Sequence, residues 1–163
     1  MLSLDPSKSK TGKTGDYAAF CDATLMSDRH VYAKMHLQLE TLPAMYARAV
    51  AIVAAAKQEG RPFKLMLIES NQFQEAVGLA IQGELQRAGL ELPIDLHHTP
   101  SDQAKHARIQ VDLAPLLAQK RLHFIGQTVG NKLTVQQMKE IPNGAHDDGP
   151  DAVSMATQAL NLL

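Results

Sequence analysis

The sequence has few cysteines, little net charge and no long apolar run, and each of these absences excludes a class of protein. Its single cysteine, Cys21, cannot form an internal disulfide or supply a cysteine zinc cluster, which is compatible with a reducing cytosol. No apolar run reaches the roughly 18 residues that a membrane span needs, and no charged-then-apolar leader opens the chain. Lysine and arginine number 16 against 17 acidic residues, and the resulting net charge of −1 argues against a strongly basic nucleic-acid binder.

Several catalytic motifs are also missing. Gly12-Lys13-Thr14 is similar to the end of a phosphate-binding loop, but Ser7 stands where that loop needs its first glycine, and a strand rather than a helix is predicted next. His97 and His98 are adjacent, no HExxH occurs, and no serine nucleophile elbow is present. Triphosphate binding and zinc or serine hydrolysis are therefore disfavoured. The basic loop is typical of a solvated turn, although its cations could touch a phosphate backbone; they are Lys8, Lys10 and Lys13.

What is present is typical of one globular domain. The 163 residues are 45% hydrophobic and 20% charged, and a chain of this length can bury a core without disulfides. The first 39 residues contain three segments rich in strand-forming residues, at 2–4, 17–26 and 31–39, which predict an antiparallel meander. Helical and strand patterns then alternate, which predicts a mixed α/β sheet with helices on its faces.

The later elements are predicted from apolar spacing and from helix-stop residues. A helix begins near Pro43 and stops at Gly60, and a second helix ends near Gly89. In order, the predicted elements after the meander are helix 43–59, strand 63–68, helix 73–88, strand 94–96, a helix from 101 or 102 perturbed by Pro115, strand 122–124, helix 134–140 and helix 148–163.

Acidic residues lie where these elements begin or end. Asp5 ends the first strand, Glu69 ends the strand KLMLIE, and Asp148 and Asp151 lie one turn apart at the start of the last helix. If the two strands are neighbours, these carboxylates meet at one edge of the sheet. They would repel one another unless a hard cation lay between them, and oxygen ligands suit Mg²⁺ or Mn²⁺.

Each acid also has a purely structural interpretation. Asp5-Pro6 is a common strand exit, Glu69 could face solvent, and Asp148 with Asp151 is typical of a capped helix start. His146 is the one histidine placed to act near the acids, and packing beside the helix start is its favoured interpretation. Taken together, the spacing favours the metal hypothesis.

At this point the sequence resembles a known family, the C-terminal nuclease domain of tailed-phage (or prophage) terminase large subunits, which has an RNase H-like fold. The resemblance extends over nearly the whole chain. It depends on four segments in order: Leu4-Asp5-Pro6 with Gly15-Asp16-Tyr17, Ile68 to Gln74, Lys105 to Ile109, and His146 to Ala152.

The resemblance implies site residues and cofactors. Asp5, Glu69 and Asp148 would hold two divalent metal ions, Mg²⁺ or Mn²⁺, and act as the catalytic residues. Asp151 matches a further metal-site acid on the same helix face, with Asp147 as the register alternative to Asp148. Two further residues, Lys105 and Arg108, match a basic pair expected to approach the DNA or order the site. We expect Asp148 to bind a metal ion directly and Asp151, one turn into the helix, to bind only through water or to orient a neighbour.

The resemblance also implies a function. The chain would be a single nuclease domain, residues 1–163, that cleaves concatemeric viral double-stranded DNA during genome packaging by two-metal hydrolysis. Its partners would be the terminase ATPase domain, the small terminase subunit and the portal, in the bacterial cytoplasm. The ATPase motor of the family is absent from the sequence, which favours an excised domain or a fragment. Two alternatives stay open: another RNase H-like nuclease of the junction-resolvase or integrase type, or an inert docking module.

Overall fold

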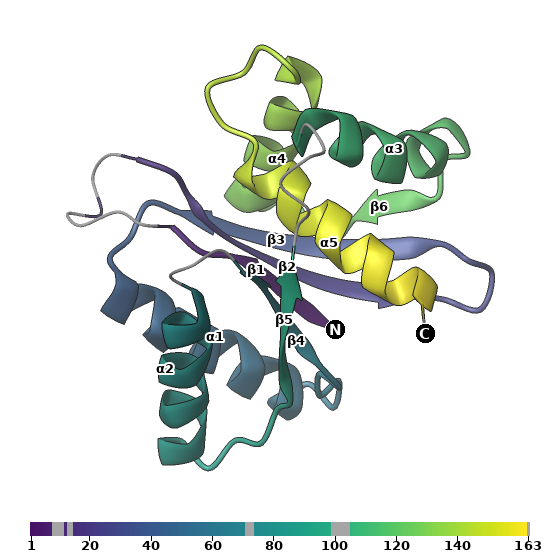
Figure 1. The fold of residues 1–163 in the computed structure, drawn as a ribbon. Helices are drawn as coiled ribbons and strands as arrows, with labels where there is room; N and C mark the ends of the chain where they lie inside the picture. Colours follow the sequence, from purple (N-terminus) through teal and green to yellow (C-terminus); the bar gives the residue numbers. More distant parts are fainter. Residues whose placement is uncertain (8–11, 13–14, 71–73, 99–104, 163) are drawn as a thin grey trace.

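The computed structural model describes residues 1–7, 12, 15–70, 74–98 and 105–162 (Figure 1). The elements follow one another as β1 (Leu2–Asp5), β2 (Ala18–Leu25), β3 (Val31–Gln38), α1 (Leu42–Gln58), β4 (Met66–Ser70), α2 (Gln74–Arg87), β5 (Ile94–His98), α3 (Lys105–Ala118), β6 (Leu122–Phe124), α4 (Val129–Glu140) and α5 (Asp148–Leu162). No helix in this described part of the chain is long and apolar enough to cross a membrane.

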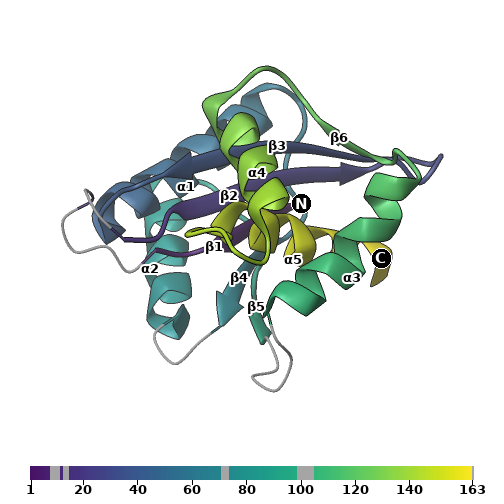
Figure 2. The ribbon, with the colours of Figure 1, turned by 90° about the horizontal axis from the view of Figure 1, so that it is seen from above.

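One mixed sheet of six strands organises the molecule, in the order β5-β4-β1-β2-β3-β6. The predicted meander is confirmed, because β2 pairs antiparallel with both β1 and β3. Strands β4 and β5 continue parallel to β1, and β6 lies parallel to β3 at the other edge. Helices cover both faces, α1 and α2 on one side and α3, α4 and α5 on the other (Figures 1 and 2). The predicted mixed α/β architecture is confirmed.

The α1–α2 side is packed with large apolar side chains. Leu4, Phe20 and Ile68 point from the sheet toward Met45 of α1 and Ile81 of α2. The predicted stops of both helices are confirmed, since Gly60 and Gly89 adopt φ of +72° and +68°, which favour glycine.

On the opposite side, α4 approaches the backbone of β3 directly. A Cβ at Gly130 would lie 2.2 Å from the carbonyl oxygen of Met35, so only glycine fits. The next residue, Asn131, accepts a hydrogen bond from the N–H of Met35 at 2.9 Å and donates to the carbonyls of Ile125 and Gly126. Strand β6 is only three residues long and ends before Met35, so Asn131 accepts the hydrogen bond that a longer edge strand would accept from this N–H.

Three expectations need correction. Strand β4 begins at Met66 rather than Phe63, and α4 begins at Val129 rather than Thr134. Helix α3 continues through Pro115, which is exposed, so the carbonyl of Val111 that proline leaves without a helical N–H partner lies on the hydrated side of the helix. Val111 lies on that same side with 74% of its surface exposed, and is not a core residue. The predicted caps of α3, Ser101 and Asp102, lie outside the described residues.

Candidate metal centre

The centre of the site is the pair formed by Asp5 and Glu69. Strands β1 and β4 run parallel with Leu4 opposite Ile68, so the residues that follow them meet at the same edge of the sheet. Both carboxylates are almost fully buried, with 7% and 9% of their surfaces exposed. The expected convergence of these two acids is therefore observed.

The third acid comes from α5. This helix lies across β1 and β2 and is attached to β1 by Ser3, whose Oγ donates a 2.7 Å hydrogen bond to the carbonyl of Ala152. Asp151, one residue earlier, is placed beside the strand ends. Asp5, Glu69 and Asp151 each offer an oxygen within 4.8 Å of the others, a geometry suited to one cation.

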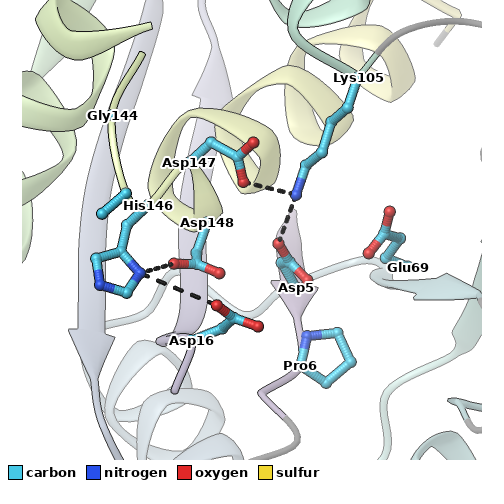
Figure 3. Close-up of a pocket in the computed structure, with 10 residues that line it drawn as sticks. Asp5, Pro6, Asp16, Glu69, Lys105, Gly144, His146, Asp147 and Asp148 are labelled. Atoms are coloured by element: carbon cyan, nitrogen blue, oxygen red, sulfur yellow. Dashed lines mark ion pairs between the residues drawn. The ribbon is translucent and has the colours of Figure 1, made fainter. Parts of the chain in front are cut away.

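A second group lies next to the first. Asp148 faces His146, with Oδ2 of Asp148 3.6 Å from Nδ1 of His146, and Asp16 lies 4.0 Å from the same nitrogen (Figure 3). Ligand atoms of these three residues again lie within 4.8 Å of one another. The Tyr17 ring packs edge-on against His146, with 5.1 Å between centroids, and fixes the imidazole.

Residues of both groups, though not Asp151, line one pocket of about 240 Å³. Its lining residues are Asp5, Pro6, Asp16, Glu69, Lys105, Gly144, Ala145, His146, Asp147 and Asp148 (Figure 3). The acid-rich lining means that a molecule entering this pocket meets concentrated negative charge, which attracts cations and repels phosphates unless cations are present.

Helix α3 brings cations to the site. The Nζ of Lys105 lies 2.8 Å from Asp147, 2.9 Å from Asp151 and 3.7 Å from Asp5. Arg108, which is buried, forms an ion pair with Asp151. Asp147 also bonds Nε2 of His106 at 2.9 Å, so it connects α3 to the start of α5.

Burial dominates the electrostatics of the acids. It raises the pKa of Asp5 well above the ordinary value, with Glu69 and Asp151 adding to the effect and Lys105 opposing it. Burial likewise raises the pKa of Asp148 to about 6, against the opposing hydrogen bond from the backbone N–H of Tyr17. A cation bound here would stabilise the ionised carboxylates against the burial and the repulsion that raise these pKa values.

For Lys105 and Asp147, neighbouring charges outweigh burial, and the shifts in their pKa values favour the charged forms. Burial disfavours the charge on Lys105, but Asp5, Asp151 and Asp147 outweigh it and raise the pKa of the ammonium. Burial also opposes ionisation of Asp147, yet the hydrogen bonds from Lys105 and His106 lower the pKa of that carboxyl. Lys105 and Asp147 therefore form a stable ion pair beside the raised acids.

The donor set fits a divalent cation. Three carboxylates supply the hard oxygen ligands that Mg²⁺ and Mn²⁺ prefer. Among the residues that the structure describes, neither Nδ1 of His146 nor Oδ2 of Asp148 has a hydrogen-bond partner, although both are buried. Buried polar atoms without partners are costly, and a bound ion would satisfy them.

The grouping of the acids differs from the sequence-based expectation. Asp151, expected behind Asp148, lies with Asp5 and Glu69, whereas Asp148 lies with Asp16 and His146. Asp147, the register alternative, belongs to neither group. Lys105 and Arg108 both lie at the acids, as expected of a pair that orders the site. The loop lysines Lys8, Lys10 and Lys13 lie outside the described residues.

Sequence reasoning missed two residues of this region, Asp16 and His106. Asp16 precedes the second strand and comes back beside the end of the first because β1 and β2 pair antiparallel, with Asp5 opposite Ala19. Because the sequence predicts that pairing, it also implies that Asp16 lies near the end of the first strand. His106 follows Lys105 at the start of α3, and its sequence neighbourhood contains no signal for its bond to Asp147, 41 residues away.

Comparison with known proteins gives a fold. No protein-family model matches the sequence, and no curated protein matches it either. Among solved structures, the chain is similar to the Mn-soaked terminase nuclease domain of human cytomegalovirus, with a TM-score of 0.68 and 14% identity over 98% of this chain and 81% of that one. Thermus thermophilus RuvC alone (16% identity, 98% and 95% of the chains) and in complex with a Holliday junction substrate (15%, 99% and 96%) both give a TM-score of 0.42.

The chain therefore has an RNase H-like fold, in the form seen in a viral terminase nuclease domain. The predicted resemblance to terminase nucleases is confirmed at the level of the fold.

Proposed function

We propose that this chain is a divalent-metal-dependent nuclease that hydrolyses phosphodiester bonds of double-stranded DNA. The observation that carries the proposal is the convergence of Asp5, Glu69 and Asp151 within 4.8 Å at the ends of two parallel central strands. Buried carboxylates concentrated in this way are unfavourable without a cation, and the same edge of the sheet holds a second group with two unsatisfied buried atoms.

Each group of acids has a separate role in the proposal. Asp5, Glu69 and Asp151 hold one cation, and Asp148 with Asp16 and His146 holds the second. When bound, two such ions supply an activated water and stabilise the departing oxygen of the phosphodiester. Because the chain needs only to fix geometry, carboxylates suffice and no covalent nucleophile is required.

The basic residues have positioning roles. Arg108 fixes the Asp151 carboxylate from the protein interior, where its side chain is only 8% exposed. Lys105 is more exposed, at 37%, and lines the pocket that a DNA phosphate would enter. We assign Lys8, Lys10 and Lys13 to backbone contacts with the same DNA.

Within this class, we propose the role of a terminase large-subunit nuclease domain that cuts concatemeric viral DNA during packaging. The support is the four-segment sequence resemblance and the fold shared with a terminase nuclease domain. On this proposal residues 1–163 form one nuclease domain, which acts in the cytoplasm of a bacterial host. The terminase ATPase domain, the small terminase subunit and the portal are its proposed partners.

Plasmid cleavage tests the proposal. The protein is incubated with supercoiled plasmid in Mn²⁺ or Mg²⁺, with and without ATP, and the reaction is repeated with excess chelator. Nicking or linearisation that requires the metal and not ATP is expected. No cleavage at any concentration of either ion would refute nuclease activity, and preferential cleavage of a four-way junction would replace the packaging role with a resolvase-type role.

A further inference from the structure

The ammonium of Lys105 lies within the proposed cation site itself. Its Nζ is 2.9 Å from Oδ2 of Asp151 and 3.7 Å from Oδ2 of Asp5, two of the three carboxylates that converge there. An ion that took Asp151 Oδ2 as a ligand at about 2.1 Å would lie no more than about 5 Å from Nζ. At that separation a divalent cation and an ammonium repel strongly in a buried site.

We propose that Lys105 is the resident counter-cation of the metal-free site and that a divalent cation displaces it, with Asp147 retaining the displaced ammonium. This inference rests on the metal-dependent function proposed above and adds a control on metal loading. Lys105 neutralises part of the buried negative charge while no ion is bound, and metal binding must remove that favourable interaction.

The position of Asp147 supports the exchange. Its Oδ1 makes the shortest of the three contacts with Nζ, at 2.8 Å, and its Oδ2 bonds His106. It belongs to neither group of potential metal ligands. Lys105 can therefore leave Asp5 and Asp151 while keeping one ion pair, and the ammonium need move only a short way.

Comparison with Arg108 explains why lysine is the movable cation. Arg108 also pairs with Asp151, but its planar guanidinium is buried at 8% exposure and oriented by that pair. Lys105 carries a point charge on a flexible stem, and 37% of its side chain is exposed. Arg108 thus stays with Asp151 in both states, whereas Lys105 exchanges.

Metal binding to wild type and to Lys105→Met tests the proposal by isothermal titration calorimetry with Mn²⁺, alongside melting temperatures with and without the ion. In Lys105→Met we expect a lower metal-free melting temperature, a larger rise on adding Mn²⁺, and Mn²⁺ affinity increased about tenfold or more. Lys105→Arg keeps the positive charge but replaces the movable ammonium with a guanidinium, so its Mn²⁺ affinity should not exceed that of wild type. Lys139→Met, at an exposed position on α4, is the matched control and should change neither value.

A second measurement uses the wild-type protein and does not depend on whether the variants fold. Lysine acetylation is followed by mass spectrometry with and without Mn²⁺. Lys105 should be shielded between carboxylates without the ion and react faster with it, while Lys139 reacts equally in both conditions. Reactivity of Lys105 that is unchanged or lowered by Mn²⁺ would contradict displacement.

The outcomes separate this inference from the function it rests on. If wild type binds Mn²⁺ and Lys105→Met binds it no more tightly, the counter-cation role is wrong and the metal-dependent nuclease stands. If neither protein binds Mn²⁺, both proposals fail together.

Discussion

The two faces of the sheet are built from different kinds of residue. The described buried side chains of α1 and α2 are all apolar, and they pack on Leu2, Leu4, Phe20 and Ile68. The other face carries small residues on its strands and polar residues on its helices. The buried polar side chains of those helices are Arg108, Asn131, Thr134, Gln137, Asp148, Asp151, Ser154 and Thr157.

This difference separates stability from chemistry. Each large apolar side chain buried on the α1–α2 face contributes more transfer free energy than a small side chain buried on the other face. Small residues such as Ala19, Ala152 and Ala156 on the other face let α5 lie close to the strands, so its acids reach the strand ends. Damage to the first face should therefore lower the free energy of unfolding, and damage to the second should lower activity.

The largest expected effect is on the acidic side. Asp5→Asn and Asp151→Asn preserve shape but remove a charged ligand, so we expect plasmid cleavage to fall to background, as for Asp148→Ala. Asp147→Ala removes only the partner of Lys105 and His106 and should cost about 10–100-fold, as is typical of residues that orient ligands. Circular dichroism must show folded protein in each case. Full activity in Asp151→Asn would mean that its grouping with Asp5 and Glu69 has no catalytic importance.

The apolar face should respond in stability alone. Ile81→Ala on α2 deletes a fully buried side chain and should lower the free energy of unfolding by about 2–5 kcal/mol, measured by urea denaturation. Leu79→Ala on the same helix is the matched control, because Leu79 is 72% exposed and its loss should cost less than about 0.5 kcal/mol. Metal-dependent cleavage per folded molecule should be unchanged in both variants. A selective loss of activity in Ile81→Ala would show that the two faces are coupled.

Two glycine-to-alanine changes sharpen the comparison. Gly130→Ala forces a methyl group against the Met35 carbonyl, so α4 must shift, at a cost of about 1–3 kcal/mol. Gly83→Ala in α2 meets only the flexible end of Arg87 at 3.8 Å and should stabilise the protein by about 0.5–1 kcal/mol. Thermal and urea unfolding of both variants measure whether each substitution lowers or raises the free energy of unfolding. A neutral Gly130→Ala would mean that the close approach of α4 to β3 is unnecessary.

The last effect is a pH dependence on the α1 side, which is absent at neutral pH and develops only in acid. Burial, with Lys34 and Arg48 adding to it, lowers the pKa of His36 to about 4 from the ordinary 6.5. Between pH 6.5 and about 4 the unfolded chain therefore binds a proton at His36 that the folded chain does not bind. Stability that is present above pH 6.5 is lost as the pH falls toward 4. Urea midpoints of His36→Gln should fall less steeply than those of wild type over that interval. Parallel curves for the two proteins would contradict this assignment.

Much of the fold and the pair at its centre could be predicted from the sequence. Strand alternation and glycine stops specify the element order, and parallel strand ends must bring Asp5 and Glu69 together. The grouping of the α5 acids could not be predicted in the same way. One residue of helix rotation turns a side chain by about 100°, so periodicity does not decide which of Asp147, Asp148 and Asp151 faces the strand ends.

The early start of α4 was missed for a related reason. Its first residues, Gly130 and Asn131, are a weak helix former and a polar residue, so the pattern there is not amphipathic. They are buried because they contact the β3 backbone, and such a contact depends on tertiary structure rather than on local propensity. Sequence patterns detect helices that bury apolar stripes better than helices that bury polar groups.

The hydrogen bond between Ser3 and Ala152 joins positions 149 residues apart, and this separation determines when the group of acids is complete during synthesis. A ribosome needs about 10–30 s to add that many residues. From the addition of Glu69 until that of Asp148, the growing polypeptide carries Asp5 and Glu69 without α5 and therefore lacks Asp148 and Asp151. If the proposed nuclease function holds, a chain released from a stalled ribosome in this interval would have the strands of the site without the acids of α5, and could not cut DNA.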